Sequence, residues 1–231
     1  MIKSKTSARI TGVLLILGTV PIITAMLLFG QHLSSPDILS AVAANRTQTL
    51  LVAFAVIIMG TACAGIGISL YPVLKRQSEG LAVAVMGLRT AEGAVVIASA
   101  VGIFALVALS QEFVKAGSPP DSLYQSAGAV IKTMNDWASN LYVLPFGIAA
   151  FIYYGIFYRA RLVPRWLSAW GLAGISLMLV SAFSGLLSLM DPSSPVLFLL
   201  NMPILTQELV LALWLIVKGF DDPETSKAQV R

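Results

Sequence analysis

Residues 81–109 read LAVAVMGLRTAEGAVVIASAVGIFALVAL. This stretch exceeds the roughly 20 apolar residues that a helix needs to cross a bilayer, and its only ionisable side chains are Arg89 and Glu92. Charge in hydrocarbon is costly, so such residues usually face a bundle interior or a water-filled cavity. The stretch therefore predicts a membrane-spanning helix and indicates where in the chain a functional site lies.

The composition of the whole chain supports a membrane protein. Hydrophobic residues make up 57% of it and charged residues 11%, whereas soluble domains carry about 25% charged residues. The 231 residues suit one compact bundle. We expect a single six-helix transmembrane domain over residues 1–220 and a polar, disordered cytoplasmic tail over residues 221–231.

Six stretches are long and apolar enough to span a membrane. They are continuously apolar and show no period of two, which favours helices over a β-barrel. The predicted fold is therefore an all-α, polytopic helical bundle with spans at residues 10–29, 50–74, 81–109, 137–158, 167–189 and 196–217.

The basic residues predict how the bundle is oriented. Of the 15 Lys and Arg residues, eleven lie on one side of the predicted spans and three on the other, with Arg89 inside the membrane. Cytoplasmic loops carry the excess of positive charge, so both termini are predicted to be cytoplasmic. The eleven are Lys3, Lys5, Arg9, Lys75, Arg76, Arg159, Arg161, Arg165, Lys218, Lys227 and Arg231, against Arg46, Lys115 and Lys132.

Both longer outer loops contain a helix-start signal. Residues 34–37 (SSPD) precede the short apolar stretch 38–42, and residues 119–122 (PPDS) precede Leu123. Ser and Asp cap helices by accepting hydrogen bonds from free backbone N–H groups. Each loop is therefore expected to hold a short interfacial helix or a helical extension of the following span.

A third membrane charge, Glu208, lies in the sixth predicted span. From the helix rise of about 1.5 Å per residue, Glu92 lies roughly 16 Å and Glu208 roughly 15 Å from the cytoplasmic ends of their spans. Both are thus near the middle of a hydrocarbon layer about 30 Å thick. Arg89 precedes Glu92 by three positions, which places the two on one helix face.

Two interpretations of these three charges remain open. In the first, Arg89, Glu92 and Glu208 bind a ligand: with two carboxylates for one guanidinium, a low dielectric favours protonation of one glutamate or capture of a cation. The protein would then bind or transport a small cation, a proton-coupled solute or an amphiphile. In the second, the charges form a buried ion-pair network between helices, and the protein is a non-transporting structural, sensory or partner-binding module.

Pro203 lies close to Glu208 in the sixth span and has polar neighbours. A proline removes a backbone N–H and frees an upstream carbonyl, which gives either a simple kink or a broken helix that lines a cavity beside Glu208. Asn201 and Thr206 flank Pro203, and Gln207 adjoins Glu208. We include Asn201 and Gln207 as candidate ligand-binding residues.

Several other classes of function find little support in the sequence. Cys63 and His32 are the only residues of their types, so neither a metal site nor a cofactor is expected, and Cys63 is interpreted as a small buried hydrophobe. Enzyme motifs such as His-Glu-x-x-His, Gly-x-Ser-x-Gly and the Walker loop are missing. The basic residues form short clusters between spans, which argues against nucleic acid. Membrane lipids are the expected partners, and the oligomeric state is open.

Four stretches resemble one family. They are SARITG at 7–12, GLRTAE at 87–92, LVPRWL at 162–167 and ELVLALWLIVKGF at 208–220. Together they are similar to the bacterial polytopic membrane proteins of domain of unknown function family 4386, over nearly the whole chain. The resemblance implies a multi-pass protein of the bacterial inner membrane and places Arg89, Glu92 and Glu208 in shared motifs. It implies no activity.

Overall fold

The computed structural model of the protein describes residues 2–119, 123–187, 189–190 and 194–221. Throughout these ranges the regular secondary structure is helical. In chain order the elements are α1 (Ile2–Phe29), the 3-10 helix η1 (Gln31–Ser34), α2 (Ile38–Ala44), α3 (Arg46–Leu74), α4 (Glu79–Lys115), α5 (Leu123–Leu141), α6 (Val143–Ala160), α7 (Arg165–Leu186) and α8 (Pro195–Val217).

Six helical stretches are long and apolar enough to cross a membrane, as the sequence predicts. Five are the single helices α1, α3, α4, α7 and α8, and the sixth is α5 followed by α6. A helix suits this environment because it satisfies its backbone hydrogen bonds internally. The expectation of an all-α fold with six helical stretches of membrane-spanning length is confirmed. The predicted spans 10–29, 50–74, 81–109, 137–158, 167–189 and 196–217 fall on these six stretches, the last residues of 167–189 lying beyond the end of α7.

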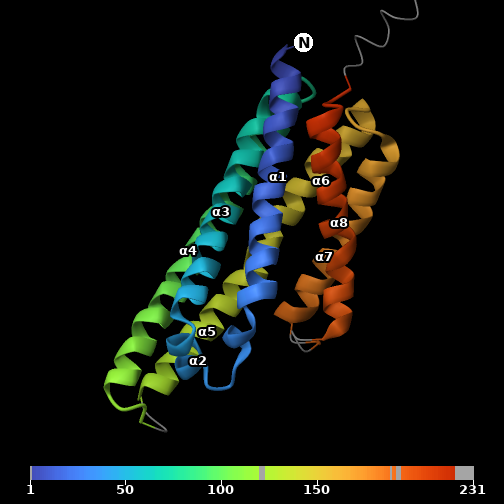
Figure 1. Cartoon of the computed structure of the whole chain (residues 1–231). Helices are drawn as coiled ribbons and strands as arrows, with labels where there is room; N and C mark the ends of the chain where they lie inside the picture. The colour runs from blue at the N-terminus through green and yellow to red at the C-terminus, as the bar shows by residue number, and fades with distance from the viewer. Residues whose placement is uncertain (1, 120–122, 188, 191–193, 222–231) are drawn as a thin grey trace, which may run out of the picture.

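The spans close into a ring that follows the order of the chain. Helix α1 packs on α3, α3 on α4, α4 on α6, α6 on α7, α7 on α8, and α8 returns to α1. Figure 1 shows α1, α3 and α4 together on one side and α7 and α8 on the other, with α5 and α6 crossing behind them. Because the ring is closed, every span has a face toward one common interior.

Both ends of the described chain lie at the same end of the bundle (Figure 1). There the Asp221 N–H donates to the Leu162 carbonyl at 2.8 Å, and the Phe157 and Phe220 rings are 5.4 Å apart. These contacts join the α6–α7 loop to the residues after α8. That this end is cytoplasmic stays a prediction from the positive charges, and residues 222–231, most of the expected tail, lie outside the described residues.

The opposite end of the bundle carries the two short connecting elements η1 and α2. The Asp37 side chain accepts from the Ser40 N–H at 3.3 Å at the start of α2. Hydrogen bonding from Ser40, first from its side chain and then from its backbone N–H, lowers the pKa of the Asp37 carboxyl. His32 Nε2 and Thr49 Oγ1 are 2.7 Å apart and join η1 to α3, and burial lowers the pKa of His32. The short helix expected in the first outer loop is confirmed.

The second outer loop leads into α5, which extends the fourth span toward this end of the bundle. The helix-start signal proposed at residues 119–122 falls largely on residues 120–122, which lie outside the described residues. The helical extension itself is confirmed, since α5 begins at Leu123.

The prolines inside the spans have different consequences. Helices α1 and α8 run without a break through Pro21 and Pro203, so the broken helix considered near Glu208 is wrong. The break occurs instead between α5 and α6, at Tyr142. Pro145 follows three residues later and cannot donate to the carbonyl of Leu141, which accounts for the interruption at this point.

Helices α3 and α4 approach closely at a pair of glycines. A Cβ atom added to Gly93 would lie 2.4 Å from the Gly60 carbonyl oxygen, and one added to Gly60 would lie 2.7 Å from the Gly93 carbonyl oxygen. In lipid, where burial of apolar surface does not drive helices together, such backbone proximity supplies much of the packing. This contact fixes the position of α4, which carries Arg89 and Glu92.

We expect Gly93→Val to destabilise the protein by about 1–3 kcal/mol, because the new side chain forces α3 and α4 apart. The measurement is thermal unfolding of the purified protein in detergent. Gly87→Val on the same helix is the matched control, since a Cβ at Gly87 would meet no atom of the described residues within 4 Å. Equal unfolding temperatures for the two variants would contradict the close packing of α3 on α4.

Candidate functional site

Arg89 and Glu92 form an ion pair inside the bundle. Each residue is only 2% exposed, and Arg89 Nη1 lies 2.9 Å from Glu92 Oε2. Their i, i+3 spacing on α4 brings the two side chains to one face, as the sequence predicts. Because both charges belong to a single helix, this pair does not by itself tie two spans together.

Two neighbouring helices add contacts to the pair. Helix α3 packs against Arg89 at Gly67, where an added Cβ atom would lie 2.8 Å from Arg89 Cβ, and the Phe146 ring on α6 lies 5.1 Å from Arg89 Cζ. An aromatic face at this distance attracts a guanidinium. The pair is therefore held from both sides by the helices that flank α4 in the ring.

A cavity of about 240 Å³ opens beside the pair and is lined by all six spans. We call it the central cavity. Its walls are mostly apolar. Polar side chains line it at two places, Arg89 and Glu92 on α4 and Asn201 and Glu208 on α8. Its lining residues are Leu15, Gly18, Thr19, Ile22, Ile23, Met59, Cys63, Ile66, Arg89, Glu92, Tyr142, Phe146, Met178, Asn201, Ile204, Leu205 and Glu208.

Glu208 reaches the central cavity from the opposite side of the ring. It lies close enough to Arg89 and Glu92 to interact with both electrostatically, but in the described part of the chain it has no ion-pair partner within 4.0 Å. The structure thus brings the three predicted charges to one cavity. Only two of them are directly paired.

Asn201 and Gln207 differ in where their side chains lie. Asn201 lines the central cavity, and its Nδ2 donates to Ser181 Oγ on α7 at 3.3 Å. Gln207 is fully buried away from the cavity: its Oε1 accepts from the Tyr154 hydroxyl at 2.5 Å, and its Nε2 donates to the Leu167 carbonyl at 3.1 Å. Gln207 therefore joins α8 to α6 and α7.

Sequence reasoning did not identify Cys63 and Tyr142 as lining residues. For Cys63 a signal was available, because Gly60, Cys63 and Gly67 share one face of α3 by their spacing, and both glycines contact α4 closely. For Tyr142 the sequence offers no comparable signal, since its direction depends on the break between α5 and α6.

Several polar atoms at the central cavity lack a hydrogen-bond partner among the described residues. They are Arg89 Nε, Glu92 Oε2 and Asn201 Oδ1; Glu92 Oε2 is close to Arg89 Nη1 but accepts no well-directed hydrogen bond from it. Buried polar groups in proteins are nearly always paired, with protein, water or ligand. These three atoms make the side of the central cavity between Arg89, Glu92 and Asn201 polar.

Comparisons with known proteins give a family and no activity. The model of a family described as "Domain of unknown function (DUF4386)" matches residues 10–219. No curated protein and no solved structure matches the chain.

We expect Arg89→Met to destabilise the protein by about 3–5 kcal/mol, because it leaves the Glu92 carboxylate buried without its partner. Adding Glu92→Gln should recover most of that loss, since a neutral pair needs no counter-charge. Thermal unfolding in detergent measures both effects.

The matched control for this prediction is Lys115→Met. Lys115 and Glu112 are also spaced i, i+3 on α4, with a distance of 2.8 Å, but their side chains are 71% and 58% exposed. Their pair should contribute less than about 1 kcal/mol. An Arg89→Met variant as stable as Lys115→Met would show that the Arg89–Glu92 pair is not in a dry environment.

Proposed function

The chain belongs to the family described as a domain of unknown function that matches residues 10–219, and for this multi-pass membrane protein we propose the binding of a small lipophilic cation in the central cavity. Glu208 would be the counter-charge of the ligand. The observation that carries the proposal is that Glu208 faces a cavity formed by all six spans with no ion-pair partner among the described residues.

The charge balance of the cavity favours a cationic ligand. Arg89 and Glu92 neutralise each other within one helix, so Glu208 leaves one carboxylate uncompensated. An isolated charge in a low-dielectric site is unfavourable. A bound monovalent cation would remove that cost, and protonation of Glu208 would remove it when the cavity is empty.

The walls of the cavity favour an apolar body around the positive charge. Met59 and Met178 are flexible and polarisable side chains that adapt to irregular ligands, and the Phe146 ring offers a π-face. The volume of about 240 Å³ corresponds to roughly eight water molecules at about 30 Å³ each. A small alkylammonium ion fits these properties better than a bare metal ion, which would need several oxygen ligands.

Transport is the activity that we propose for such a site. A cavity near the membrane midplane, bounded by every span, is the arrangement used by transporters that alternate access between two sides. We further propose that the protein lies in the bacterial inner membrane with both termini in the cytoplasm. The orientation follows from the excess of positive charge at the end of the bundle where the termini lie.

The second candidate is a structural or sensory module in which the charges only stabilise the fold. It is less well supported, because the Arg89–Glu92 pair lies within α4 and Glu208 forms no ion pair across the ring in the described residues. A network that held helices together would be expected to make such a contact.

We expect purified protein in detergent to bind tetraethylammonium, and Glu208→Gln to weaken that binding at least tenfold, or about 1.4 kcal/mol. Isothermal titration calorimetry measures the affinity. The matched control is Glu112→Gln, which neutralises an exposed glutamate on α4 and should bind as the parent does.

Two results would count against cation binding. If Glu208→Gln binds tetraethylammonium as tightly as the parent, Glu208 is not the counter-charge. If the parent does not bind it and Glu208→Gln only changes the unfolding temperature, the structural alternative is favoured.

A further inference from the structure

A second cavity lies between the central cavity and the end of the bundle that carries η1 and α2. Its volume is about 290 Å³, and α1, α3, α4 and α5 contribute to its walls together with the η1–α2 connection. We call it the outer cavity. Its lining includes polar side chains as well as apolar ones, among them Ser99, Lys132, Asn135 and Asp136. Polar walls of this kind can hold water.

The two cavities share part of their lining. Ile22 of α1, Met59 of α3 and Tyr142 belong to both sets of residues. Side chains that line both cavities lie between them, so these three form part of the wall that separates the two cavities. Tyr142 is also close enough to Glu92 and Glu208 to interact with their charges.

Tyr142 lies at the one break in the fourth span, between the end of α5 at Leu141 and the start of α6 at Val143. Because Pro145 supplies no N–H to the preceding turn, the backbone here has fewer hydrogen bonds than a continuous helix. Breaks of this kind are where helices bend. The wall between the cavities is thus placed where the helix can move most easily.

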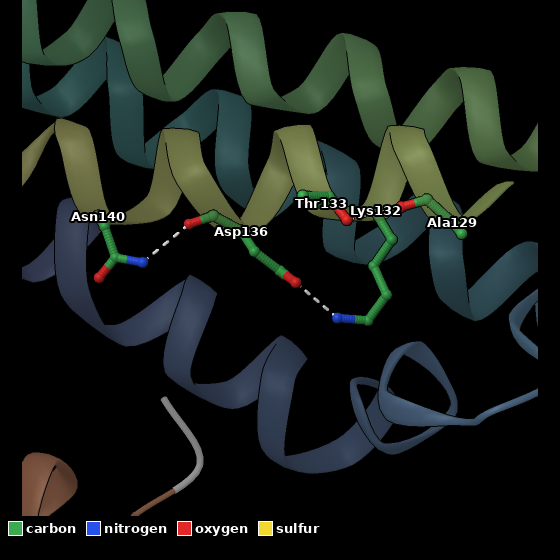
Figure 2. Close-up of polar contacts among 5 residues, drawn as sticks. All are labelled: Ala129, Lys132, Thr133, Asp136 and Asn140. Carbon is green, nitrogen blue, oxygen red and sulfur yellow. Dashed lines mark hydrogen bonds and ion pairs between the residues drawn. The ribbon is translucent and has the colours of Figure 1, made fainter. Parts of the chain in front are cut away.

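The outer cavity is bordered by a partly exposed ion pair on α5. Lys132 Nζ lies 2.7 Å from Asp136 Oδ2, and their side chains are 38% and 61% exposed. Figure 2 shows both side chains, with Asn140 one turn further along, pointing to the side of α5 that faces α1. The outer cavity therefore has charged, solvent-accessible groups at its border, whereas Arg89 and Glu92 at the central cavity are buried.

From this arrangement we propose that the outer cavity is the entrance through which a small solute reaches the central cavity, with Tyr142 as the partition between them. The proposal rests on the proposed function, because it assigns a route to the site at Glu208. The route runs from Lys132 and Asp136, past Ser99 and Tyr142, to Arg89, Glu92 and Glu208. It requires no opening on the side of the bundle where the termini lie.

The only cysteine of the chain is a built-in probe of this route, because Cys63 lines the central cavity and is 4% exposed. The experiment treats the folded, full-length protein in detergent with a methanethiosulfonate that carries a trimethylammonium group. The thiolate attacks the reagent, a mixed disulfide forms and methanesulfinate leaves. Intact mass spectrometry gives the labelling rate, and comparison of variants cancels the intrinsic reactivity of the thiol.

We expect Ser99→Trp, which fills the outer cavity, to slow the labelling of Cys63 at least tenfold. Val101→Trp is the matched control, because Val101 is on the same helix but is 66% exposed, and it should label at the parent rate. A third variant keeps the test decisive if Ser99→Trp does not fold. Asp136→Lys adds positive charge at an exposed position, and it should slow the cationic reagent and speed up the anionic sulfonatoethyl reagent.

Slower labelling in either test variant, with Val101→Trp unchanged, supports the entrance. Parent-like rates in both test variants would overturn it, and so would a Cys63 that reacts only after denaturation. The labelling needs no bound cation, so it fails independently of the proposed function. If the protein binds tetraethylammonium but the labelling results overturn the entrance, the cation reaches its site by another path. If the labelling results support the entrance but tetraethylammonium does not bind, the entrance stands and the proposed cation site is wrong.

Discussion

The structure depends on the need to keep the charges of Arg89 and Glu92 out of lipid. Arg89 and Glu92 are each 2% exposed. One helix alone cannot bury its own ion pair in this way, so other helices must surround it. The ring of six spans does this, with α3 packing against Arg89 at Gly67 and α6 contributing the Phe146 ring. The cost of charge in hydrocarbon therefore determines which face of α4 points inward, and so where the cavity forms.

Closing the ring is a matter of backbone contacts as much as side chains. The seam between α1 and α8 depends on Gly12, where a Cβ would lie 2.7 Å from the Ala212 carbonyl oxygen. Gly60 and Gly93 do the same for α3 and α4. Gly12, Gly60 and Gly93 all lie within residues 10–219, which the family model matches.

Much of the fold could be predicted from sequence, because a membrane allows few solutions. A backbone in lipid must satisfy its own hydrogen bonds, so apolar stretches of sufficient length identify the spans, and i, i+3 spacing identifies the Arg89–Glu92 pair. The inward faces could not be predicted equally well, since these helices are apolar all round. Gln207 shows this: it adjoins Glu208 in sequence, but neighbours on a helix face different directions, and it bonds to α6 and α7 instead.

The central claim is that the cavity beside Glu208 is a binding site for a small cation, and anomalous diffraction tests it most directly. Crystals of the full chain would be soaked in tetraethylarsonium, a quaternary cation whose arsenic scatters anomalously. We predict an anomalous peak in the central cavity, between the Glu208 carboxylate and the Met178 side chain or the Phe146 ring, and no such peak in Glu208→Gln crystals. A parent structure with an ordered cavity and no arsenic peak beside Glu208 would contradict the account.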